Sequence, residues 1–285
     1  MKLTRYRNGS ILLCACTLLL FVLSDASSLP ETSAPQRIVS LVPALTEELY
    51  LLGVDDRIVG VTTYCQRPIE AQQKEKVGAV VEVNVEKILS LRPDLVIASP
   101  LTDQKQIQKL RDLGMRVEIF QAPEDFEELC SGFLQLSRLV GGEQKAREII
   151  KQATSDIEYI KGKITGLSRP KVFVQIGEKP LVAAGGDSFI DDFVAFAGGV
   201  NIAGDVKTSV YSREAVVKKN PDIILIAKMG IEGAREQEQW AKYTTIRAVQ
   251  TDRIYTVDPY RFCSPTPLSF VESVQELVRL FHGTE

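Results

Sequence analysis

The chain has 285 residues, of which 45% are hydrophobic and 25% are charged, and its formal net charge is −3. A slightly acidic chain lacks the basic surface that nucleic acids and anionic lipids attract, so we expect no nucleic-acid partner. The length accommodates one large domain or two lobes of ordinary size.

The first 26 residues have the features of a secretory signal peptide. Lys2, Arg5 and Arg7 precede an apolar run over residues 11–23, and Ser24-Asp25-Ala26 provides the small residues of a cleavage site. As a helix, this 13-residue run spans about 20 Å, which is short of the roughly 30 Å needed to cross a bilayer. We expect residues 1–26 to be cleaved off and the protein to reside in the periplasm. Lipid attachment at Cys16 is the alternative.

Short apolar runs alternate with helical patterns along the rest of the chain. Residues 37–42 predict a strand that ends at Pro43, and residues 45–52 predict a helix. Further strands are predicted at residues 58–62, 95–98, 117–120, 172–176, 223–227 and 254–257, and further helices at residues 104–113 and 126–140. Buried strands that alternate with helices are typical of parallel sheets covered on both faces. The fold class is therefore α/β.

One segment of the chain occurs twice in similar form. Pro93-Asp94 stands between a helical pattern and an apolar strand, and Pro221-Asp222 stands in the same setting 128 residues later. A helix ends before proline because the residue preceding proline is disfavoured in the α region. Two such units, half a mature chain apart, predict two Rossmann-like lobes with central, mostly parallel sheets.

A long helical pattern separates the two halves. After Gly141 and Gly142, apolar residues recur in steps of three and four over residues 143–164. A helix of this length measures about 33 Å, roughly the size of a lobe. An ordinary surface helix within one domain is the alternative. The predicted organisation is an N-terminal lobe, one long bridging helix and a C-terminal lobe, over residues 37–140, 141–166 and 170–285.

The mature sequence offers little for catalysis or metal binding. Its three cysteines, Cys65, Cys130 and Cys263, cannot form a complete disulfide framework, and its single histidine is His282. The sequence contains no Cys-x-x-Cys pair, dinucleotide fingerprint, phosphate loop or nucleophile elbow. We therefore expect no metal site, no resident cofactor and no catalytic residues. A secreted α/β enzyme is the remote alternative.

Six short motifs follow one another in a specific order along the mature chain. They are residues 37–47, 64–71, 84–88, 92–96 and 212–214, and Ser264-Pro265. In order and spacing they resemble the helical-backbone (class III) periplasmic solute-binding proteins, which carry cobalamin, haem and ferric siderophores. The resemblance covers residues 37–282 and is greatest to the cobalamin-binding members.

This resemblance implies a function as well as a fold. It implies two α/β lobes joined by a helix, a ligand cleft between them, and the transmembrane subunits of an ABC importer as partners. We therefore expect a monomeric substrate-binding protein whose ligand is a small metal chelate, a corrinoid such as cobalamin. A ferric siderophore or haem is the alternative ligand.

The ligand should lie beyond the carboxyl ends of the strands, where open α/β sheets bind their ligands. The loops there carry Pro43, Ala44, Tyr64, Cys65, Ser99 and Leu101 in the first lobe, and Gly177, Tyr211, Asp258, Tyr260 and Arg261 in the second. A corrinoid is a broad apolar disc with an amide rim. Tyr64 and Tyr260 are therefore expected to pack on the ring, and Asp258 and Arg261 to hydrogen-bond the rim. For Cys65 and Cys263, on facing loops, we expect packing, with metal contact as the alternative.

The resemblance also implies two docking residues. One surface glutamate on each lobe meets arginines of the transporter, and the matching positions here are Glu75 and Glu214. Exposed ion pairs contribute only about 0–1 kcal/mol each. Their role is therefore orientation and encounter rather than affinity. For Glu75, the alternative is an ordinary charge on a solvated helix.

Overall fold

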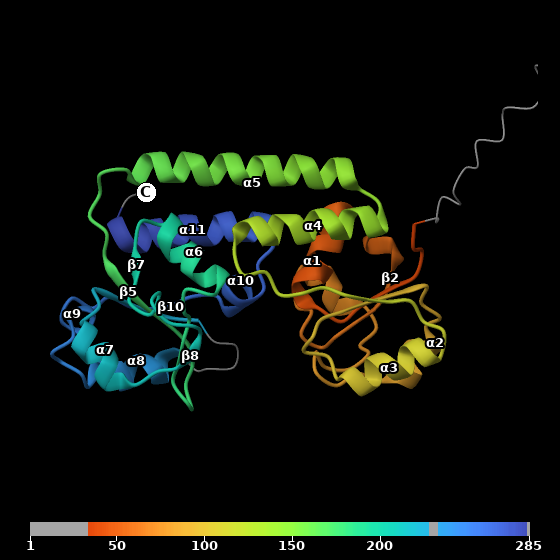
Figure 1. The fold of residues 1–285 in the computed structure, drawn as a ribbon, viewed down its shortest axis with the longest axis horizontal. Helices are drawn as coiled ribbons and strands as arrows, with labels where there is room; N and C mark the ends of the chain where they lie inside the picture. The colour runs from red at the N-terminus through yellow and green to blue at the C-terminus, as the bar shows by residue number, and fades with distance from the viewer. Residues whose placement is uncertain (1–33, 228–232, 284–285) are drawn as a thin grey trace, which may run out of the picture. The chain divides into compact units, whose positions relative to one another are not determined.

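Two β-sheets flanked by helices make up the part of the chain that the computed structural model describes, residues 34–227 and 233–283 (Figure 1). The predicted signal peptide over residues 1–26, and with it Cys16, lies outside the described residues. Within those described ranges, no helix combines the length and the apolar character needed to span a bilayer.

The N-terminal lobe is built on a four-stranded sheet. Its elements are β1 (Ile38–Ser40), α1 (Pro43–Leu52), η1 (Asp55–Arg57), β2 (Ile58–Val61), η2 (Ile69–Gln73), α2 (Val85–Ser90), β3 (Leu95–Ala98), α3 (Gln104–Asp112), β4 (Val117–Ile119) and α4 (Phe126–Val140). The strand order is β2-β1-β3-β4, and all neighbours are parallel. Ile38 packs in one apolar cluster and Val39 in another, because successive side chains of a strand point to opposite faces. Both faces of the sheet are covered, as predicted.

The C-terminal lobe is built on a six-stranded, mixed sheet. Its elements are β5 (Lys171–Gly177), β6 (Val182–Ala183), α6 (Phe189–Phe196), β7 (Val200–Asn201), β8 (Ser209–Val210), α7 (Arg213–Lys219), β9 (Ile223–Ile226), α8 (Gly233–Ala241), α9 (Arg247–Gln250), β10 (Ile254–Thr256), α10 (Pro259–Cys263) and α11 (Pro267–His282). Strands β10, β9, β5 and β7 are parallel, whereas β6 and β8 pair antiparallel. The predicted strands β5, β9 and β10 are confirmed. The two-residue strands β6, β7 and β8 were not predicted, because two residues carry no periodicity.

The repeated sequence segment forms the same corner in both lobes. Asp94 accepts hydrogen bonds from the backbone N–H groups of Gln36 and Arg37 at 2.7 and 3.0 Å, just before β1. Asp222 accepts one from the N–H of Lys171, the first residue of β5, at 2.7 Å. Asp94 stands just before β3 and Asp222 just before β9. Each carboxylate therefore ties the start of the strand that follows it to the start of the neighbouring strand, β1 or β5.

The two corners also share a backbone conformation. Arg92 and Asn220, the residues before Pro93 and Pro221, both have a φ of 47°. Residues other than glycine seldom adopt this left-handed conformation. Its occurrence at matched positions supports the similar construction of the two lobes.

Helix α5 (Glu143–Ile164) connects the lobes and runs alongside α4 and α11 (Figure 1). Its bounds are the predicted ones. Ala146 packs in the apolar cluster of the N-terminal lobe, whereas Ala153, Ile157 and Ile160 pack in that of the C-terminal lobe. One uninterrupted helix therefore contributes to both cores, which confirms the bridging helix.

Helix α4 also belongs to both cores, although we assigned all of it to the N-terminal lobe. Phe126 and Leu129 pack in the C-terminal cluster, and Phe133 and Leu136 in the N-terminal one. Asp192 of α6 accepts a hydrogen bond from the N–H of Phe126 at 2.9 Å. A lobe boundary at residue 140 therefore does not describe the packing of this helix, because its apolar face extends across both lobes.

Candidate functional site

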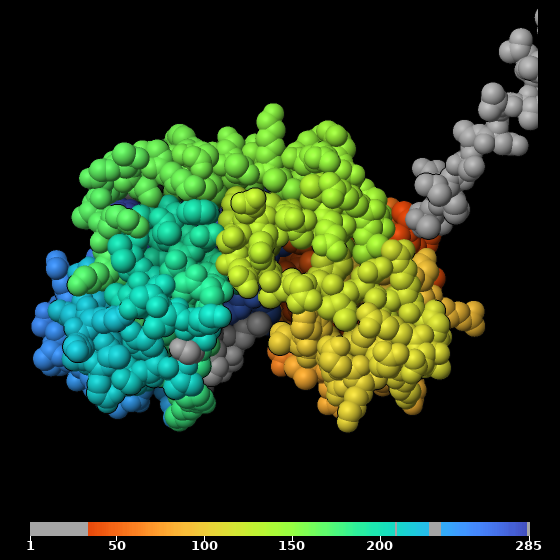
Figure 2. Space-filling model, in the orientation of Figure 1, coloured from red at the N-terminus to blue at the C-terminus, as the bar shows by residue number. Residues whose placement is uncertain are grey.

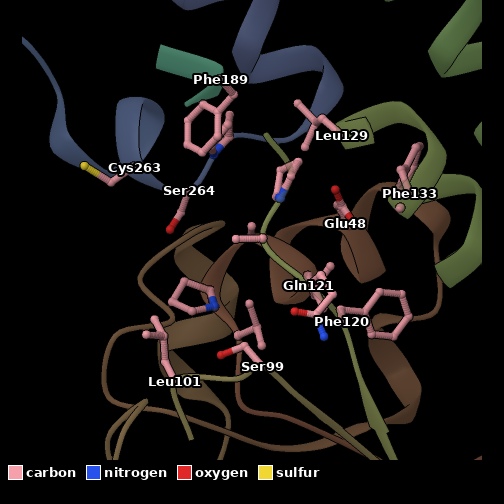
Figure 3. Close-up of a pocket in the computed structure, with 18 of the residues that line it drawn as sticks. Glu48, Ser99, Leu101, Phe120, Gln121, Leu129, Phe133, Phe189, Cys263 and Ser264 are labelled. Carbon is pink, nitrogen blue, oxygen red and sulfur yellow. The ribbon is translucent and has the colours of Figure 1, made fainter. Parts of the chain in front are cut away.

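A cavity of about 520 Å³ lies between the two lobes, within the range of roughly 300–1,000 Å³ that is usual for small-molecule sites. Figure 2 shows the hollow between the lobes, and Figure 3 shows Phe189 and Ser264 on one side of the cavity and Ser99 and Leu101 on the other. The wall consists of Val42, Pro43, Ala44, Leu45, Glu48, Tyr64, Val80, Ser99, Pro100, Leu101, Phe120, Gln121, Ala122, Pro123, Glu128, Leu129, Gly132, Phe133, Phe189, Cys263, Ser264 and Pro265.

Five of the predicted ligand contacts lie in this wall, namely Pro43, Ala44, Tyr64, Ser99 and Leu101. They follow β1, β2 and β3, as expected for a ligand site beyond the carboxyl ends of parallel strands. Tyr64 and Leu101 are 45% and 69% exposed, respectively. Large apolar side chains are therefore left uncovered at the cavity.

Cys65 lies behind the wall rather than in it. Its side chain is fully buried in the N-terminal lobe, and its Sγ lies 3.1 Å from Oγ1 of Thr46. Cys65 therefore does not line the cavity, and its contact with a ligand stays a prediction. The expected packing role of its small side chain is confirmed.

Gly177 and Tyr211 of the second lobe also lie outside the wall. A Cβ on Gly177 would collide with the side chain of Val182 at 2.7 Å, since β5 and β6 pair here. The ring of Tyr211 packs against Phe173 with centroids 5.8 Å apart. Neither residue lines the cavity, because neighbouring parts of the C-terminal lobe surround both, and their contacts with a ligand stay predictions.

Asp258, Tyr260 and Arg261 lie beside the cavity but not in its wall. Asp258 caps α10 by accepting a hydrogen bond from the N–H of Tyr260 at 2.8 Å. Tyr260 lines a small adjoining recess, which shares Pro43, Tyr64 and Ser264 with the cavity. None of the three lines the cavity itself, and their contacts with the ring and rim of a ligand stay predictions.

The charges of these residues take part in ion pairs, one of which, between Arg67 and Asp258, joins the two lobes. Arg67 of the N-terminal lobe lies 2.9 Å from Glu47 and 3.9 Å from Asp258 of the C-terminal lobe. Arg261 lies 3.6 Å from Asp258 and 3.4 Å from Glu272. Burial raises the pKa of Glu47, and the guanidinium of Arg67 opposes this effect. Both arginines are therefore already engaged by carboxylates.

Several wall residues were not predicted, because they lie on helices rather than on strand-end loops. They include Glu48 of α1, Gly132 and Phe133 of α4, and Phe189 of α6. A signal for Glu48 existed in the sequence. It follows Leu45 by three residues, on the buried helix face that also carries Leu49.

Glu48 is a buried acid, with 1% of its surface exposed. Burial raises the pKa of its carboxyl group well above the ordinary value, and the charge of Glu47 raises it further. Its Oε2 has no hydrogen-bond partner among the described residues. On α4, burial raises the pKa of the Cys130 thiol to about 12, and Glu48 adds to this effect. This environment favours the neutral, protonated form of Glu48.

Two further polar groups belong to the wall. The Oγ of Ser99 is buried and has no hydrogen-bond partner within the described part of the chain. Cys263 donates from its Sγ to the carbonyl of Ala227 at 3.6 Å, and burial raises the pKa of its thiol to about 11. A thiol with a raised pKa is a poor metal ligand. Among residues 34–227 and 233–283, no group of three or more His, Cys, Asp or Glu residues is placed to hold a metal ion.

The two predicted docking glutamates are exposed, one on each lobe. Glu75 follows η2 in a loop and forms an ion pair with Lys87 of α2, and its side chain is 52% exposed. Glu214 lies in the first turn of α7. Helices α2 and α7 both lie on the side of the molecule opposite α5 (Figure 1).

Comparisons with known proteins agree with this architecture. Residues 38–260 match the family model described as periplasmic binding protein. The chain is 34% identical to the uncharacterized ABC transporter substrate-binding lipoprotein YvrC of Bacillus subtilis, over 90% of this chain and 83% of that protein. It is 29% identical to a vitamin B12-binding protein of Vibrio cholerae, over 93% and 95% of the two chains.

Solved structures show the same fold. The vitamin B12 binding protein BtuF of V. cholerae superimposes with a TM-score of 0.73 at 26% identity, covering 86% of this chain and 96% of BtuF. A periplasmic heme binding protein of Pseudomonas aeruginosa superimposes with a TM-score of 0.76 at 26% identity, covering 88% and 94% of the two chains. Because the family model spans most of the sequence and these relatives align along nearly all of it, the chain belongs to the periplasmic binding proteins, the class III solute-binding proteins.

Proposed function

We propose that this protein is the substrate-binding component of an ABC importer and captures a corrinoid, such as cobalamin, between its lobes. Similarity to an ABC transporter substrate-binding lipoprotein supports the first part, and similarity to vitamin B12-binding proteins supports the second. In this proposal the protein acts as a monomer in the periplasm after cleavage of residues 1–26. Lipid attachment at Cys16 is the alternative.

The observation that carries the corrinoid proposal is the composition of the cavity wall. Most of the wall is apolar, from proline, leucine, valine and phenylalanine side chains. The acidic side chains in it are Glu48 and Glu128, and no lysine, arginine or histidine occurs among the described wall residues. A broad apolar disc whose rim carries uncharged amides is compatible with such a wall, because neither part of it needs a cationic partner.

Anionic iron chelates are less compatible with this wall. Haem carries two propionate groups, and many ferric siderophores carry net negative charge. A buried anion needs a positive partner or several hydrogen-bond donors. The nearest arginines noted above, Arg67 and Arg261, are engaged by Glu47, Asp258 and Glu272.

Haem is the second candidate, and one observation favours it. Tyr64 lies in the cavity wall with 45% of its surface exposed. A tyrosine hydroxyl is an established axial ligand of haem iron. Absorbance spectra of the protein with haem, before and after Tyr64→Phe, distinguish this candidate. A spectral change that depends on the hydroxyl group would favour haem.

We expect isothermal titration calorimetry to give a nanomolar Kd, about −12 kcal/mol, for cyanocobalamin or for cobinamide. Tyr64→Ala should weaken binding by about tenfold or more, because it removes an aromatic anchor from the wall. Arg261→Ala is the comparison variant and should have a smaller effect, because Arg261 lies outside the wall and is engaged by Asp258 and Glu272. If neither corrinoid binds below about 1 μM while haem or a ferric siderophore does, the corrinoid proposal is wrong.

We expect the double substitution Glu75→Ala with Glu214→Ala to leave the Kd for the ligand unchanged and to lower importer-dependent uptake several-fold. Both residues are exposed and lie outside the cavity wall, so their loss affects encounter and orientation. The control is Glu118→Ala with Glu158→Ala, which removes two exposed, ion-paired glutamates on β4 and α5. Equal uptake by the docking variant and the control would remove the docking assignment.

A further inference from the structure

Glu48 occupies a place in the wall where an apolar residue would be the simpler choice. It lies on α1 between the buried residues Leu45 and Leu49, and Figure 3 shows it on the side of the cavity where Leu129 and Phe133 of α4 lie. An acid at such a position costs stability unless something in the protein or in its ligand compensates for its burial.

The described surroundings of Glu48 do not compensate for the burial of its Oε2. Glu48 is only 1% exposed, and its Oε2 has no hydrogen-bond partner within the described residues. The groups that face or neighbour it are Glu47 on the same helix, and Glu128 and Cys130 on α4. All of these are acids or thiols, so none stabilises a carboxylate. These surroundings therefore favour the uncharged carboxyl group of Glu48, which carries one O–H donor.

We propose that the uncharged carboxyl group of Glu48 donates a hydrogen bond to an amide carbonyl on the rim of the bound ligand. This inference rests on the corrinoid-binding function proposed above, and it identifies a specificity residue in the cavity. The O–H group suits a neutral carbonyl acceptor. The surrounding acids make the same position unfavourable for a ligand carboxylate.

The proposed role of Glu48 predicts how the affinity for the ligand changes with pH. As the pH rises through the elevated pKa of Glu48, the proton is lost and the donor becomes a buried anion that faces the ligand carbonyl. Affinity should therefore be highest on the acid side and fall as the pH rises. In Glu48→Gln an amide N–H replaces the O–H donor and does not ionise, so this part of the pH dependence should disappear.

The experiment is calorimetric titration with cyanocobalamin and with cobinamide, at several values from about pH 6 to about pH 9. Four proteins are compared, the wild type, Glu48→Gln, Glu48→Leu and Glu127→Leu. Glu48→Leu should bind about tenfold more weakly, because the ligand carbonyl is then buried without a donor. Glu48→Gln should lose less affinity than Glu48→Leu. Glu127→Leu removes a neighbouring exposed carboxylate that is not part of the wall and should bind as the wild type does.

Thermal melting curves check that all variants are folded at the temperature of the titrations. Wild-type affinity in Glu48→Leu, or the same pH dependence in the wild type and Glu48→Gln, would overturn the role of Glu48 while the corrinoid proposal stands. If the wild type binds neither corrinoid, the proposed function fails and this inference fails with it.

Discussion

Gly132→Trp is expected to weaken ligand binding by about a hundredfold or more, which corresponds to about 2.7 kcal/mol. Gly132 lies on α4 in the cavity wall, and a Cβ built at this position meets no described atom within 4 Å. A side chain placed there therefore extends into the cavity instead of colliding with the protein. An indole group would occupy space that the ligand needs, and the ligand could bind only by displacing it.

Two control variants separate this effect from changes in folding. Gly132→Ala should retain binding and raise the free energy of unfolding by about 0.5–1 kcal/mol, because alanine is the better helix former and the site is open. Gly162→Trp places the same side chain on α5 at an equally open but exposed position. It should bind ligand normally. Unchanged affinity in Gly132→Trp would show that the ligand does not occupy this cavity.

The sequence was most informative where local rules determine local structure. Pro93 and Pro221 mark where two helices end, and Asp94 and Asp222 each tie a strand entry to its neighbour. The helix ends depend on residues close in sequence, whereas the hydrogen bonds of Asp94 and Asp222 join residues 57 and 51 positions apart and became visible only in the structure. The bridging helix was predictable because its apolar spacing and the glycines that flank it all lie in one continuous stretch of the sequence.

The cavity was less predictable because it depends on packing between distant segments. The segments directly after β1, β2 and β3 supplied Pro43, Tyr64 and Ser99. Other parts of the wall come from the C-terminal lobe and from α4, and the dual position of α4 between the lobes cannot be read from its helical pattern alone. Asp258 illustrates the same limit. Its loop position suggested a ligand contact, whereas the fold uses its carboxylate to cap α10 and to pair with arginines of both lobes.

A buried ion pair in the C-terminal lobe carries the largest expected effect on stability. Glu236 of α8 is fully buried and pairs with Arg213, whose Cζ lies 4.3 Å from the centroid of the Trp240 ring. The Nε1 of Trp240 donates to Oε1 of Gln175 on β5 at 2.7 Å. Arg213 opens α7, so this chain of contacts also positions the neighbouring Glu214, the proposed docking residue.

Arg213→Leu is therefore expected to lower the free energy of unfolding by about 3–5 kcal/mol, because it leaves the carboxylate of Glu236 buried without its partner. The double variant Arg213→Leu with Glu236→Leu should recover most of this loss, since two apolar side chains need no compensation. Urea denaturation followed by circular dichroism measures both. A loss below about 1 kcal/mol in Arg213→Leu would mean that Glu236 does not depend on Arg213. In that case α7, with the proposed docking residue Glu214, must be held mainly by apolar packing around the buried Val216.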